Sequence, residues 1–444
     1  MEFLKSNRPL LAALLLLLLP CTAFADAFFT YGVSPRTIGM GNAFSATADD
    51  WTGAYYNPGG VALQHRPVLG VGYMANFANL NYIGKSEAEL DESRAMIFGA
   101  NFPLPFDSGF LKDRFTFGVT GYMPEGRLLQ MRVNAPAKPS LILLQNAHRT
   151  NAMYPAFGIQ LTKGLGIGGG VQTFIDTIGE INAFIDPAGN VQTEVGEELL
   201  VTYSPTAGVL FKPGEHWEAM KPWSFGFVFR DESFTRYQIP VGAVLDQIPF
   251  IVTFNAKSIF TPRQYLLAMA YQLGRWRLEG DASFNEWSRF PDPNLNITVT
   301  VDIPIIPLNF INSIKREPKF HDTFSGRVGT EVSVYEHAKI DLLARGGYMF
   351  DPSPVPPQTG YTNQLDADRH VGALSFGCKW KGVGDTQFGA PLLLDLVWQT
   401  QYLPRRVAYK NESVSTDNPG YPKIGLEGWL HFVGISLSTY FDYE

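Results

Sequence analysis

The chain has 444 residues and a net charge of −7; 45% of its residues are hydrophobic, 14% aromatic and 17% charged, and 43 are glycine. The hydrophobic content excludes a disordered chain. The acidic balance argues against a nucleic-acid-binding protein, which would usually carry a basic face. Few charges with many aromatic residues and glycines fit alternating β-strands better than amphipathic helices. The length suits several ordinary domains or one large barrel.

The N-terminus predicts export. Lys5 and Arg8 precede an apolar stretch at 10–19, and a small-x-small cleavage site follows at 23–25. We therefore expect residues 1–25 to be a cleaved signal peptide. The apolar stretch is too short to span a bilayer as a helix, and no run of 18 apolar residues follows it. The exported chain is then either a soluble periplasmic protein or a β-barrel in the outer membrane.

The segment 26–66 does not resemble barrel strands, because it is rich in glycine, alanine and small polar residues. Its Asn57-Pro58-Gly59 predicts a tight turn, since proline fixes φ and glycine accepts positive φ. A compact segment of this length before a large barrel could fill the lumen as a plug. We expect a hatch over 26–66 and a transmembrane barrel over 67–444.

Alternation of polar and apolar residues dominates the rest of the chain. From Arg275 to Trp287, polar side chains fall on one face and apolar ones on the other, which is the period of a strand. Strands of about ten residues, polar inside and apolar outside, are typical of a transmembrane barrel. We predict an all-β fold, an antiparallel barrel of about fourteen strands. The predicted strands are 67–83, 94–106, 114–123, 152–162, 165–183, 195–212, 223–235, 263–273, 275–286, 323–335, 338–350, 370–380, 390–402 and 427–441.

Short and long connections alternate between these strands, as in outer-membrane barrels. Two long loops, 236–262 and 287–322, are apolar, although exposed loops are normally polar. We expect the two loops to pack into an apolar, outward-facing groove that captures ligand through Ile305, Leu308 and Phe310. The alternative is that these stretches are strand ends that extend above the membrane.

Several segments resemble the FadL/TodX family of outer-membrane transporters for hydrophobic compounds. They are residues 39–43, 48–50 and 55–60 in the hatch, then 286–290, and finally 348–355 with 366–369. The family usually has Asn-Pro-Ala where this chain has Asn57-Pro58-Gly59. Family members also commonly end on an aromatic residue, whereas this chain continues to Asp442-Tyr443-Glu444.

The resemblance implies passive uptake of long-chain fatty acids or aromatic hydrocarbons across a Gram-negative outer membrane. It implies capture by extracellular loops, passage through a hatch-gated lumen and lateral release, by a monomer in contact with membrane lipid and lipopolysaccharide. The alternative is a barrel resembling PorV, which acts as a protein-secretion shuttle. An outer-membrane lipid hydrolase is a third class, but no Ser/His constellation for one is visible.

The third predicted strand contains a candidate lateral gate. Its alternation is regular until it reaches Gly121, Pro124 and Gly126. Pro124 has no N–H to donate, and the glycines permit an inward bend. Family members resemble one another in a kink of this strand, so we expect the gate at 121–126, with the hatch turn at 57–59 below it. The alternative is that Pro124 simply ends the strand.

Three cations fall on predicted inward faces: Arg327, Arg345 and Lys379. A carboxylate ligand would need such a partner, because an unpaired charge in an apolar channel is costly. The alternative, which we favour, is a ladder of inward ion pairs with residues such as Glu331 and Asp341.

No cofactor, metal or catalytic residue is expected. The 7 histidines are scattered without metal-ligand spacing. Residues 164–169 match the glycine pattern of dinucleotide-binding loops, but alternating strand residues follow where such a loop needs a helix. We therefore expect these glycines to begin a strand.

Overall fold

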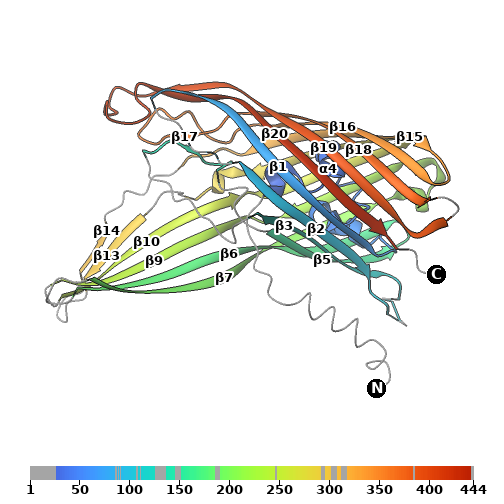
Figure 1. Ribbon diagram of the computed structural model, residues 1–444, viewed down its shortest axis with the longest axis horizontal. Helices are drawn as coiled ribbons and strands as arrows, with labels where there is room; N and C mark the ends of the chain where they lie inside the picture. Colours follow the sequence, from blue (N-terminus) through green and yellow to red (C-terminus); the bar gives the residue numbers. More distant parts are fainter. Residues whose placement is uncertain are drawn as a thin grey trace, which may run out of the picture.

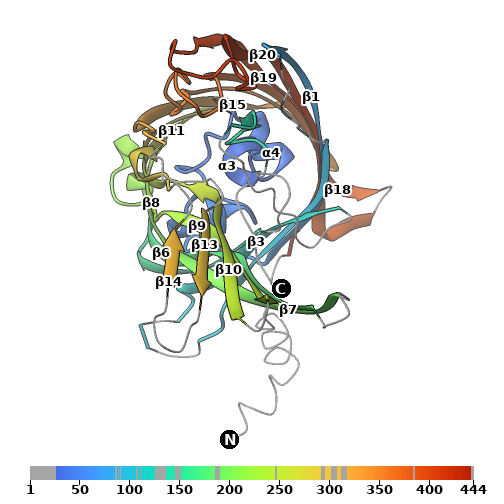
Figure 2. The same cartoon turned by 90° about the vertical axis from the view of Figure 1, so that its left-hand side faces the viewer.

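The chain folds into a β-barrel with a small helical segment inside it (Figure 1, Figure 2). The computed structural model describes residues 27–85, 88, 90, 92–106, 109–110, 112–125, 137–145, 152–185, 191–245, 248–291, 296–301, 308–311, 318–383 and 386–441, some of them by their backbone alone. In this part of the chain, 18 strands form one sheet. Four of them project beyond one end of the barrel, which leaves fourteen in its wall.

The wall strands agree with the predicted ones to within a few residues. They are β1 (Val68–Ile83), β2 (Ser93–Pro103), β3 (Phe115–Pro124), β5 (Ala152–Thr162), β6 (Leu165–Ile185), β7 (Val191–Phe211), β8 (Trp223–Arg230), β11 (Arg263–Leu273), β12 (Trp276–Glu286), β15 (Thr323–Glu336), β16 (Ile340–Asp351), β18 (Arg369–Val383), β19 (Thr386–Tyr409) and β20 (Lys423–Tyr440). All pairs between neighbouring wall strands are antiparallel, and pairing of β1 with β20 closes the barrel. The predicted fold class is confirmed.

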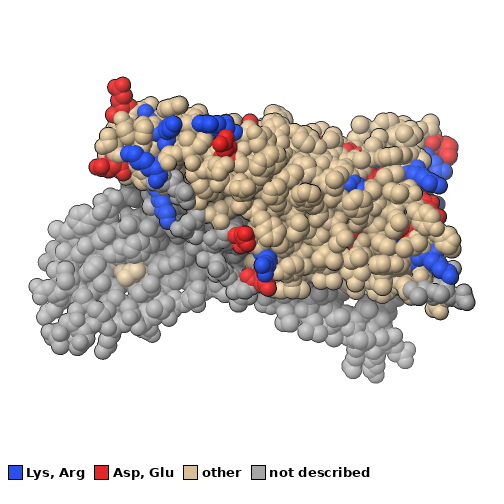
Figure 3. All heavy atoms as spheres, turned by 45° about the horizontal axis from the view of Figure 1, so that its top comes forward, with Lys and Arg blue, Asp and Glu red and all other residues tan. Residues whose placement is uncertain are grey.

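The alternation of side chains separates a polar lumen from an apolar outer wall. On β12, Glu279 and Asp281 are buried, whereas Trp276 and Leu278 on the other face are exposed. In the view of Figure 3, acidic and basic side chains gather toward the two ends of the described wall, and a largely charge-free belt lies between them. This is the surface that a bilayer requires of a spanning barrel. No helix among the described residues is long and apolar enough to cross a membrane.

The two apolar loops form strands of their own. The first makes a hairpin of β9 (Ser233–Leu245) and β10 (Ile248–Thr261), and the second contributes β13 (Asn296–Val301) and β14 (Leu308–Ile311). β10 pairs with β13, and β9 pairs with the far end of β6, so both loops belong to one sheet that projects from the long-loop end. Apolar, β-branched residues in these loops favour extended backbone, which is why they continue the sheet.

Residues 27–64 lie inside the barrel before β1 begins (Figure 2). They contain four short helices: α3 (Ala27–Tyr31), α4 (Pro35–Gly39), α5 (Gly53–Tyr56) and α6 (Pro58–Val61). Ser34 and Thr37 form a capping box at the start of α4. The side chain of Asn57 caps α6, whose first residue is Pro58. These side chains accept hydrogen bonds from backbone N–H groups in the first turn, which allows α4 and α6 to form although each is only about one turn long.

A second small core lies at the long-loop end, and we call it the extracellular cap: residues 137–145, 352–368 and 410–425. Its strands β4 (Ser140–Leu141) and β17 (Gln364–Leu365) pair in parallel. The Nζ of Lys410 donates to three backbone carbonyls, those of Gln358, Gly360 and Thr362, at 2.7–2.8 Å. The cap therefore joins three separate loops. Three short 3₁₀ turns complete the described elements: η1 (Pro213–Glu215), η2 (Glu218–Met220) and η3 (Trp287–Arg289).

Candidate functional site: the hatch and its seat

The hatch turn predicted at Asn57-Pro58-Gly59 is held against the barrel wall. The Oδ1 of Asn57 accepts a hydrogen bond from the Gly59 N–H at 2.9 Å. Its Nδ2 donates to the carbonyls of Ser45 in the hatch, at 2.7 Å, and of Val209 on β7, at 3.0 Å. Asn57 is fully buried, so its amide satisfies backbone groups that water cannot reach.

Glycines on β6 and β7 make room for this turn. A Cβ at Gly166 would lie 2.2 Å from the Gly59 oxygen, and one at Gly168 would lie 2.1 Å from the Pro58 oxygen. Side chains at these positions would overlap with the hatch backbone. The glycine run at 164–169 begins strand β6, as expected, and its physical role is to receive the hatch.

A second set of glycines seats the other side of the hatch. Gly41 has a φ of +63°, and a Cβ there would lie 2.6 Å from the Tyr348 nitrogen on β16. On the wall, a Cβ at Gly347 would lie 2.0 Å from the Gly41 nitrogen, and one at Gly329 would lie 2.2 Å from the Met40 oxygen. Backbone therefore packs directly on backbone at both seats, with no room for side chains between the hatch and the wall.

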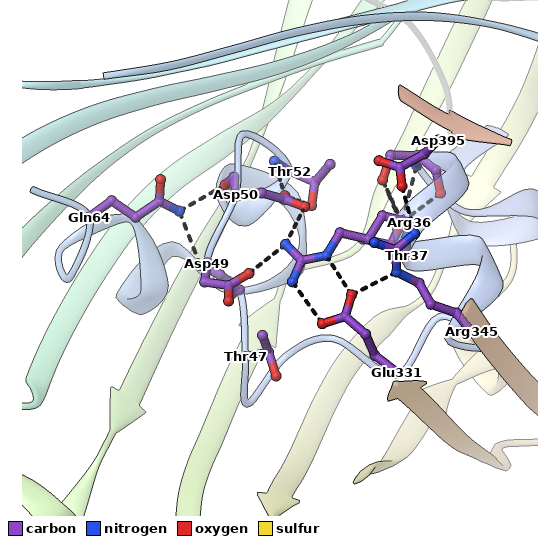
Figure 4. Close-up of polar contacts among 12 residues, drawn as sticks. Arg36, Thr37, Thr47, Asp49, Asp50, Thr52, Gln64, Glu331, Arg345 and Asp395 are labelled. Atoms are coloured by element: carbon purple, nitrogen blue, oxygen red, sulfur yellow. Dashed lines mark hydrogen bonds and ion pairs between the residues drawn. The ribbon is translucent and has the colours of Figure 1, made fainter. Parts of the chain in front are cut away.

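A network of charged side chains ties the hatch to the wall, and we call it the latch (Figure 4). Arg36 of the hatch pairs with Asp49 at 2.7 Å and with Glu331 on β15 at 3.2 Å. Glu331 also accepts from Arg345 at 2.7 Å, and Arg345 pairs with Asp395 on β19 at 2.6 Å. Because the hatch and three strands share these charges, moving the hatch would leave buried ions without partners.

Polar wall residues also satisfy the irregular hatch backbone. Glu279 accepts from the N–H groups of Ala46 and Thr47, and Asp281 accepts from those of Phe44 and Ser45, over 2.6–3.4 Å. Farther along the wall, Gln399 and Gln401 on β19 donate to hatch carbonyls at 3.0–3.1 Å. A loop without regular ladders can stay buried only if such partners exist.

Arg230 at the end of β8 contacts the hatch backbone in the same way. Its Nη2 donates to the carbonyl of Tyr55 at 2.6 Å and of Tyr56 at 3.1 Å, at the C-terminal end of α5. The guanidinium lies 4.6 Å from the centre of the Tyr55 ring, and its Nη1 donates to Gln264 at 3.3 Å. Arg230 is 4% exposed, so α5 is fixed to the wall by a buried charge.

Aromatic rings connect the barrel mouth with the hatch. Phe290 stacks on Phe320 at 4.3 Å near the long-loop end, and Trp287 joins them, with its ring 6.2 Å from that of Phe290. Trp287 lies 5.9 Å from Phe29 on α3. Phe28, which directly precedes Phe29 in the chain, belongs to a second group of rings.

That second group leads to the wall. Phe28 lies 5.2 Å from Tyr55, 5.4 Å from Tyr154 on β5 and 5.8 Å from Tyr122 on β3. We call the whole series, from Phe320 to Tyr122, the aromatic chain. It passes through α3, whose two neighbouring phenylalanines face different groups.

The three predicted lumen cations have different surroundings. Arg345 forms ion pairs with Glu331 and Asp395 in the latch. This agrees better with the alternative of inward ion pairs than with a ligand contact. Lys379 is partly exposed and lies opposite Asp341 in the β16–β18 ladder. Arg327 is half-buried, and among the described residues nothing accepts a hydrogen bond from its Nε. Their roles toward a ligand stay predictions.

The predicted capture residues cannot be placed in a groove. Ile305 lies outside the described residues, and Leu308 and Phe310 belong to β14, which is described by its backbone. The pairing of β10 with β13 does bring the two loops together. The apolar groove itself stays a prediction.

The predicted gate lies partly outside the described residues, because Gly126 does. β3 pairs with β2 as far as Pro124 and with β5 as far as Tyr122, where β5 begins at Ala152. Gly121 also has a packing role, since a Cβ there would lie 2.3 Å from the Phe98 ring. Beyond Tyr122, β2 is the one described strand that pairs with β3.

Sequence reasoning missed Arg36, Arg230 and the wall acids as hatch partners. The sequence did contain an indication of the Arg36 contact. A cation in a segment that is expected to fill the lumen is costly without a partner, so an acid on the wall is expected. Glu279 and Asp281 were correctly predicted to share a face, but nothing in their spacing indicated that backbone N–H groups would be their partners. In the described part of the chain, no group of three or more His, Cys, Asp or Glu side chains could hold a metal ion.

Comparison with known proteins agrees with this architecture. The family model described as outer membrane protein transport protein (OMPP1/FadL/TodX) matches residues 16–390. A search of curated proteins gave no match.

Solved structures show the same fold at low sequence identity. A Pseudomonas aeruginosa FadL homologue is 14% identical with a TM-score of 0.56, over 93% of this chain and 98% of that one. The CymD monoaromatic hydrocarbon channel is 12% identical with a TM-score of 0.52, over 93% and 98%. The P. putida toluene transporter TodX is 12% identical with a TM-score of 0.50, over 93% and 99%.

The family is one of transport proteins of the outer membrane rather than of enzymes. Its match covers most of the chain, and the barrel, the internal hatch and the charge-free belt agree with it. This chain therefore belongs to the OMPP1/FadL/TodX family of outer-membrane transport proteins.

Proposed function

We propose that this protein takes up hydrophobic compounds, long-chain fatty acids or aromatic hydrocarbons, by diffusion through the barrel. The aromatic chain carries this proposal, because its two groups of rings extend from Phe320 at the barrel mouth to Tyr122 at the wall, joined along the chain by the neighbouring residues Phe29 and Phe28. Apolar ligands are held by such surfaces through burial rather than directed bonds. The energy source is the concentration gradient alone.

The hatch acts as the gate of this path. It fills the lumen between two glycine seats, and the latch holds it in place. A ligand that follows the aromatic chain therefore meets α3 and α5 before it can go further. Displacement of these short helices, with the barrel unchanged, would open the path.

Release is lateral, toward the bilayer, next to Tyr122. The aromatic chain ends at this residue, and Tyr122 is also the last residue of β3 that pairs with the described part of β5. An apolar ligand that leaves here enters lipid directly and avoids the aqueous periplasm, which favours release by the hydrophobic effect.

An uptake assay tests the function. Cells lacking the gene are complemented with the wild-type chain, and uptake of radiolabelled oleate or toluene is measured with and without it. We expect complementation to raise uptake of at least one compound, because it supplies an apolar path through the outer membrane. Secretion of proteins to the cell surface should not change, which separates this function from that of a protein-secretion shuttle.

Two tryptophans provide a matched pair of variants for this assay. Trp287 is buried in the aromatic chain, whereas Trp398 lies on the lipid-facing wall and is 61% exposed. We expect Trp287→Ala to reduce uptake and Trp398→Ala to leave it unchanged at equal expression. Equal uptake by both variants would argue against the aromatic chain as the path.

A further inference from the structure

An apolar hollow lies on the outer face of the barrel wall, and we call it the outer groove. It extends over neighbouring strands from β8 to β16 and has a volume of about 700 Å³. Its floor consists of small residues, Gly280 and Ala282 on β12 and Gly326 on β15. On β12 these alternate with the lumen-facing Glu279 and Asp281, so the floor belongs to the outward face. The volume is that of a pocket for one small organic group or chain.

Large side chains border this floor on both sides. Leu267 and Met269 of β11 lie on one side, next to the floor residues of β12 in the ladder. Tyr348 and Phe350 of β16 lie on the other side, next to β15. Large side chains beside small ones make this part of the wall concave, whereas a barrel wall is otherwise convex.

The surroundings of the outer groove are lipid hydrocarbon, because its outward residues are apolar apart from Tyr348. Two charged residues, Asp281 and Arg327, also contribute to its lining, but they belong to the lumen face. Asp281 accepts hydrogen bonds from hatch N–H groups, and Arg327 lies opposite it in the ladder. An apolar hollow in such a wall loses dispersion contacts unless a chain fills it.

An acyl chain suits this hollow better than a second copy of the protein does. Two convex barrel walls touch along a line, so a second barrel would rest on the bordering side chains such as Leu267, which is 65% exposed. The floor beneath would then stay empty. A flexible chain can instead lie directly on Gly280, Ala282 and Gly326.

A hydrogen-bonding group lies beside the outer groove. The hydroxyl of Tyr348 is 2.7 Å from the Nδ1 of His370, and the His370 ring is 5.0 Å from that of Phe350. A neutral imidazole has one donor and one acceptor nitrogen, so Nε2 carries the proton when Nδ1 accepts from Tyr348. Among the described residues, Tyr348 alone hydrogen-bonds to this ring. The Nε2 of His370 is therefore available to an acceptor on a bound lipid.

The position of His370 indicates the leaflet. It is the second residue of β18, directly after the long loop at 352–368. It pairs with Tyr402, which pairs in turn with Trp429. Aromatic girdles lie where headgroups meet hydrocarbon, and the long loops of such barrels are extracellular. The outer groove therefore lies in the outer leaflet, where the lipid is lipopolysaccharide and the carbonyls of its acyl chains lie at this level.

We propose that the outer groove binds an acyl chain of lipopolysaccharide, and that His370 donates a hydrogen bond to the carbonyl at the head of this chain. The chain lies on the small floor residues between β11 and β16. This inference is separate from the proposed uptake function, because the groove is on the outer face of the wall and the aromatic chain is inside the barrel.

Filling the groove tests the proposal. The full-length protein, freed of lipid in dodecyl maltoside, is given purified lipopolysaccharide, and the lipid bound per barrel is measured by native mass spectrometry. Gly326→Leu adds an outward side chain where a Cβ meets nothing within 4 Å, and Ala282→Leu is a second such variant. We expect each to weaken binding about fivefold or more, since lost burial of one or two CH₂ groups already has this effect.

The matched control is Gly389→Leu on β19, outside the groove. An added Cβ there also meets nothing within 4 Å, so this variant should bind lipopolysaccharide like the wild type. Heat-dependent migration on gels checks that all variants are folded. Wild-type binding by folded Gly326→Leu and Ala282→Leu barrels would overturn the proposal.

Substitutions of His370 test the hydrogen bond. His370→Phe keeps a ring but removes the donor, so it should weaken binding of lipopolysaccharide. His370→Gln supplies an amide donor and should recover part of the loss. Equal binding by the wild type and both variants would refute the contact with the carbonyl.

Two further outcomes would identify another occupant. If dioleoylphosphatidylglycerol binds as tightly as lipopolysaccharide and is weakened equally by Gly326→Leu, the assignment to the lipid of the outer leaflet is wrong. If the wild type forms a dimer that Gly326→Leu abolishes, a second copy of the chain occupies the groove. Preferential binding of lipopolysaccharide to a monomeric barrel is the result that supports the proposal.

Discussion

Single glycines decide how the hatch fits the barrel. At Gly168 the hatch carbonyl of Pro58 occupies the space that a side chain would need. At Gly372, on the outer wall, an added Cβ would meet nothing within 4 Å. The same residue type therefore has a steric function at one position and none at the other.

This difference predicts the behaviour of two variants. Gly168→Val should displace the hatch turn and open the lumen, so cells should become sensitive to vancomycin, which an intact outer membrane excludes. Purified protein should show a larger single-channel conductance. Gly372→Val should change neither quantity, and a folded Gly168→Val barrel without any leak would contradict the seat.

Arg345 illustrates how a buried charge is shared. Its side chain is fully buried between Glu331 and Asp395. Removal of one member of a buried ion pair typically costs 3–5 kcal/mol, because the partner stays buried without compensation. By contrast, the more exposed pair of Lys381 and Asp341 should contribute about 1 kcal/mol or less.

We therefore expect Arg345→Met to destabilise the protein by about 3–5 kcal/mol. Urea unfolding in detergent, followed by tryptophan fluorescence, measures this loss, and Lys381→Met is the matched control. Fatty-acid and hydrocarbon binding should fall by similar factors in Arg345→Met. A selective loss of fatty-acid binding would instead assign Arg345 to the ligand.

Among the elements, β3 is the one whose surroundings change along its length. It has β2 and β5 as neighbours up to Tyr122, and then β2 alone among the described strands. Pro124 falls in this second part, and the residues directly before β5, 146–151, lie outside the described residues.

The lateral gate is tested by Pro124→Val. Valine restores the N–H and favours extended backbone, so β3 should straighten and uptake should decrease while ligand capture at the surface is retained. The single variant is cleaner than one that also changes Gly121, since a side chain there would overlap Phe98. Pro103→Val, at the other end of the neighbouring β2, is the control. Normal uptake by Pro124→Val would argue against a gate here.

The extracellular cap contains a buried acid, Asp366, that makes its stability depend on pH. Burial raises the pKa of this carboxyl to about 6, although Arg369 lowers it in part. Because the folded cap then binds a proton more tightly than the unfolded chain, stability falls as pH rises from about 4 to about 6 and stays reduced above that. A shift of about two pKa units corresponds to roughly 3 kcal/mol.

Replacing Asp366 by asparagine should remove this dependence. We expect the cap of Asp366→Asn to be more stable than the wild type at pH 7 and similar to it at pH 4. Hydrogen exchange of the peptide 352–368 at the two pH values measures the difference. An equal effect of the substitution at both pH values would show that Asp366 does not titrate as described.

At the scale of the whole molecule, the wall is higher on one side. β9, β10, β13 and β14 extend the sheet beyond the long-loop end, whereas the strands on the opposite side end under the extracellular cap. The extension is built from the two apolar loops, so we expect it to be the first surface that a ligand contacts.

Replacing Ile305, Leu308 and Phe310 with serine tests this capture surface. We expect weaker ligand binding and slower uptake at low ligand concentration, with the barrel still folded. Heat-dependent migration on gels checks folding, and Trp398→Ala is the control on the outer wall. Unchanged affinity in the triple variant would refute capture by this sheet.

Sequence alone predicted the barrel well for a physical reason. Alternation such as that from Arg275 to Trp287 is a local property, since each side chain must face either lipid or lumen. The predicted first strand, 67–83, differs from β1 by one residue at one end. Regular alternation therefore predicts the first and last residues of a strand even when the neighbouring strands are unknown.

The site was less predictable because its contacts are not local. Gly166 meets Gly59 more than one hundred residues away, and Arg36 meets Glu331 almost three hundred residues away. The residue types show that a glycine can receive another backbone and that an arginine can pair with a glutamate. Which two residues of the chain meet, however, depends on the order and tilt of the strands. The sequence shows that the two loops are apolar, but their joining into one sheet depends on the pairing of β10 with β13, which is not local.

The dependence of the hatch on its seats sets an order of assembly. The hatch precedes β1 in the chain, but its partners lie on strands all around the wall, from Asn101 on β2 to Phe432 on β20. It can dock only after almost the whole wall has formed, and the wall closes only when β20 pairs with β1. The segment 27–64, which is the first described part of the chain, is therefore among the last parts to become ordered.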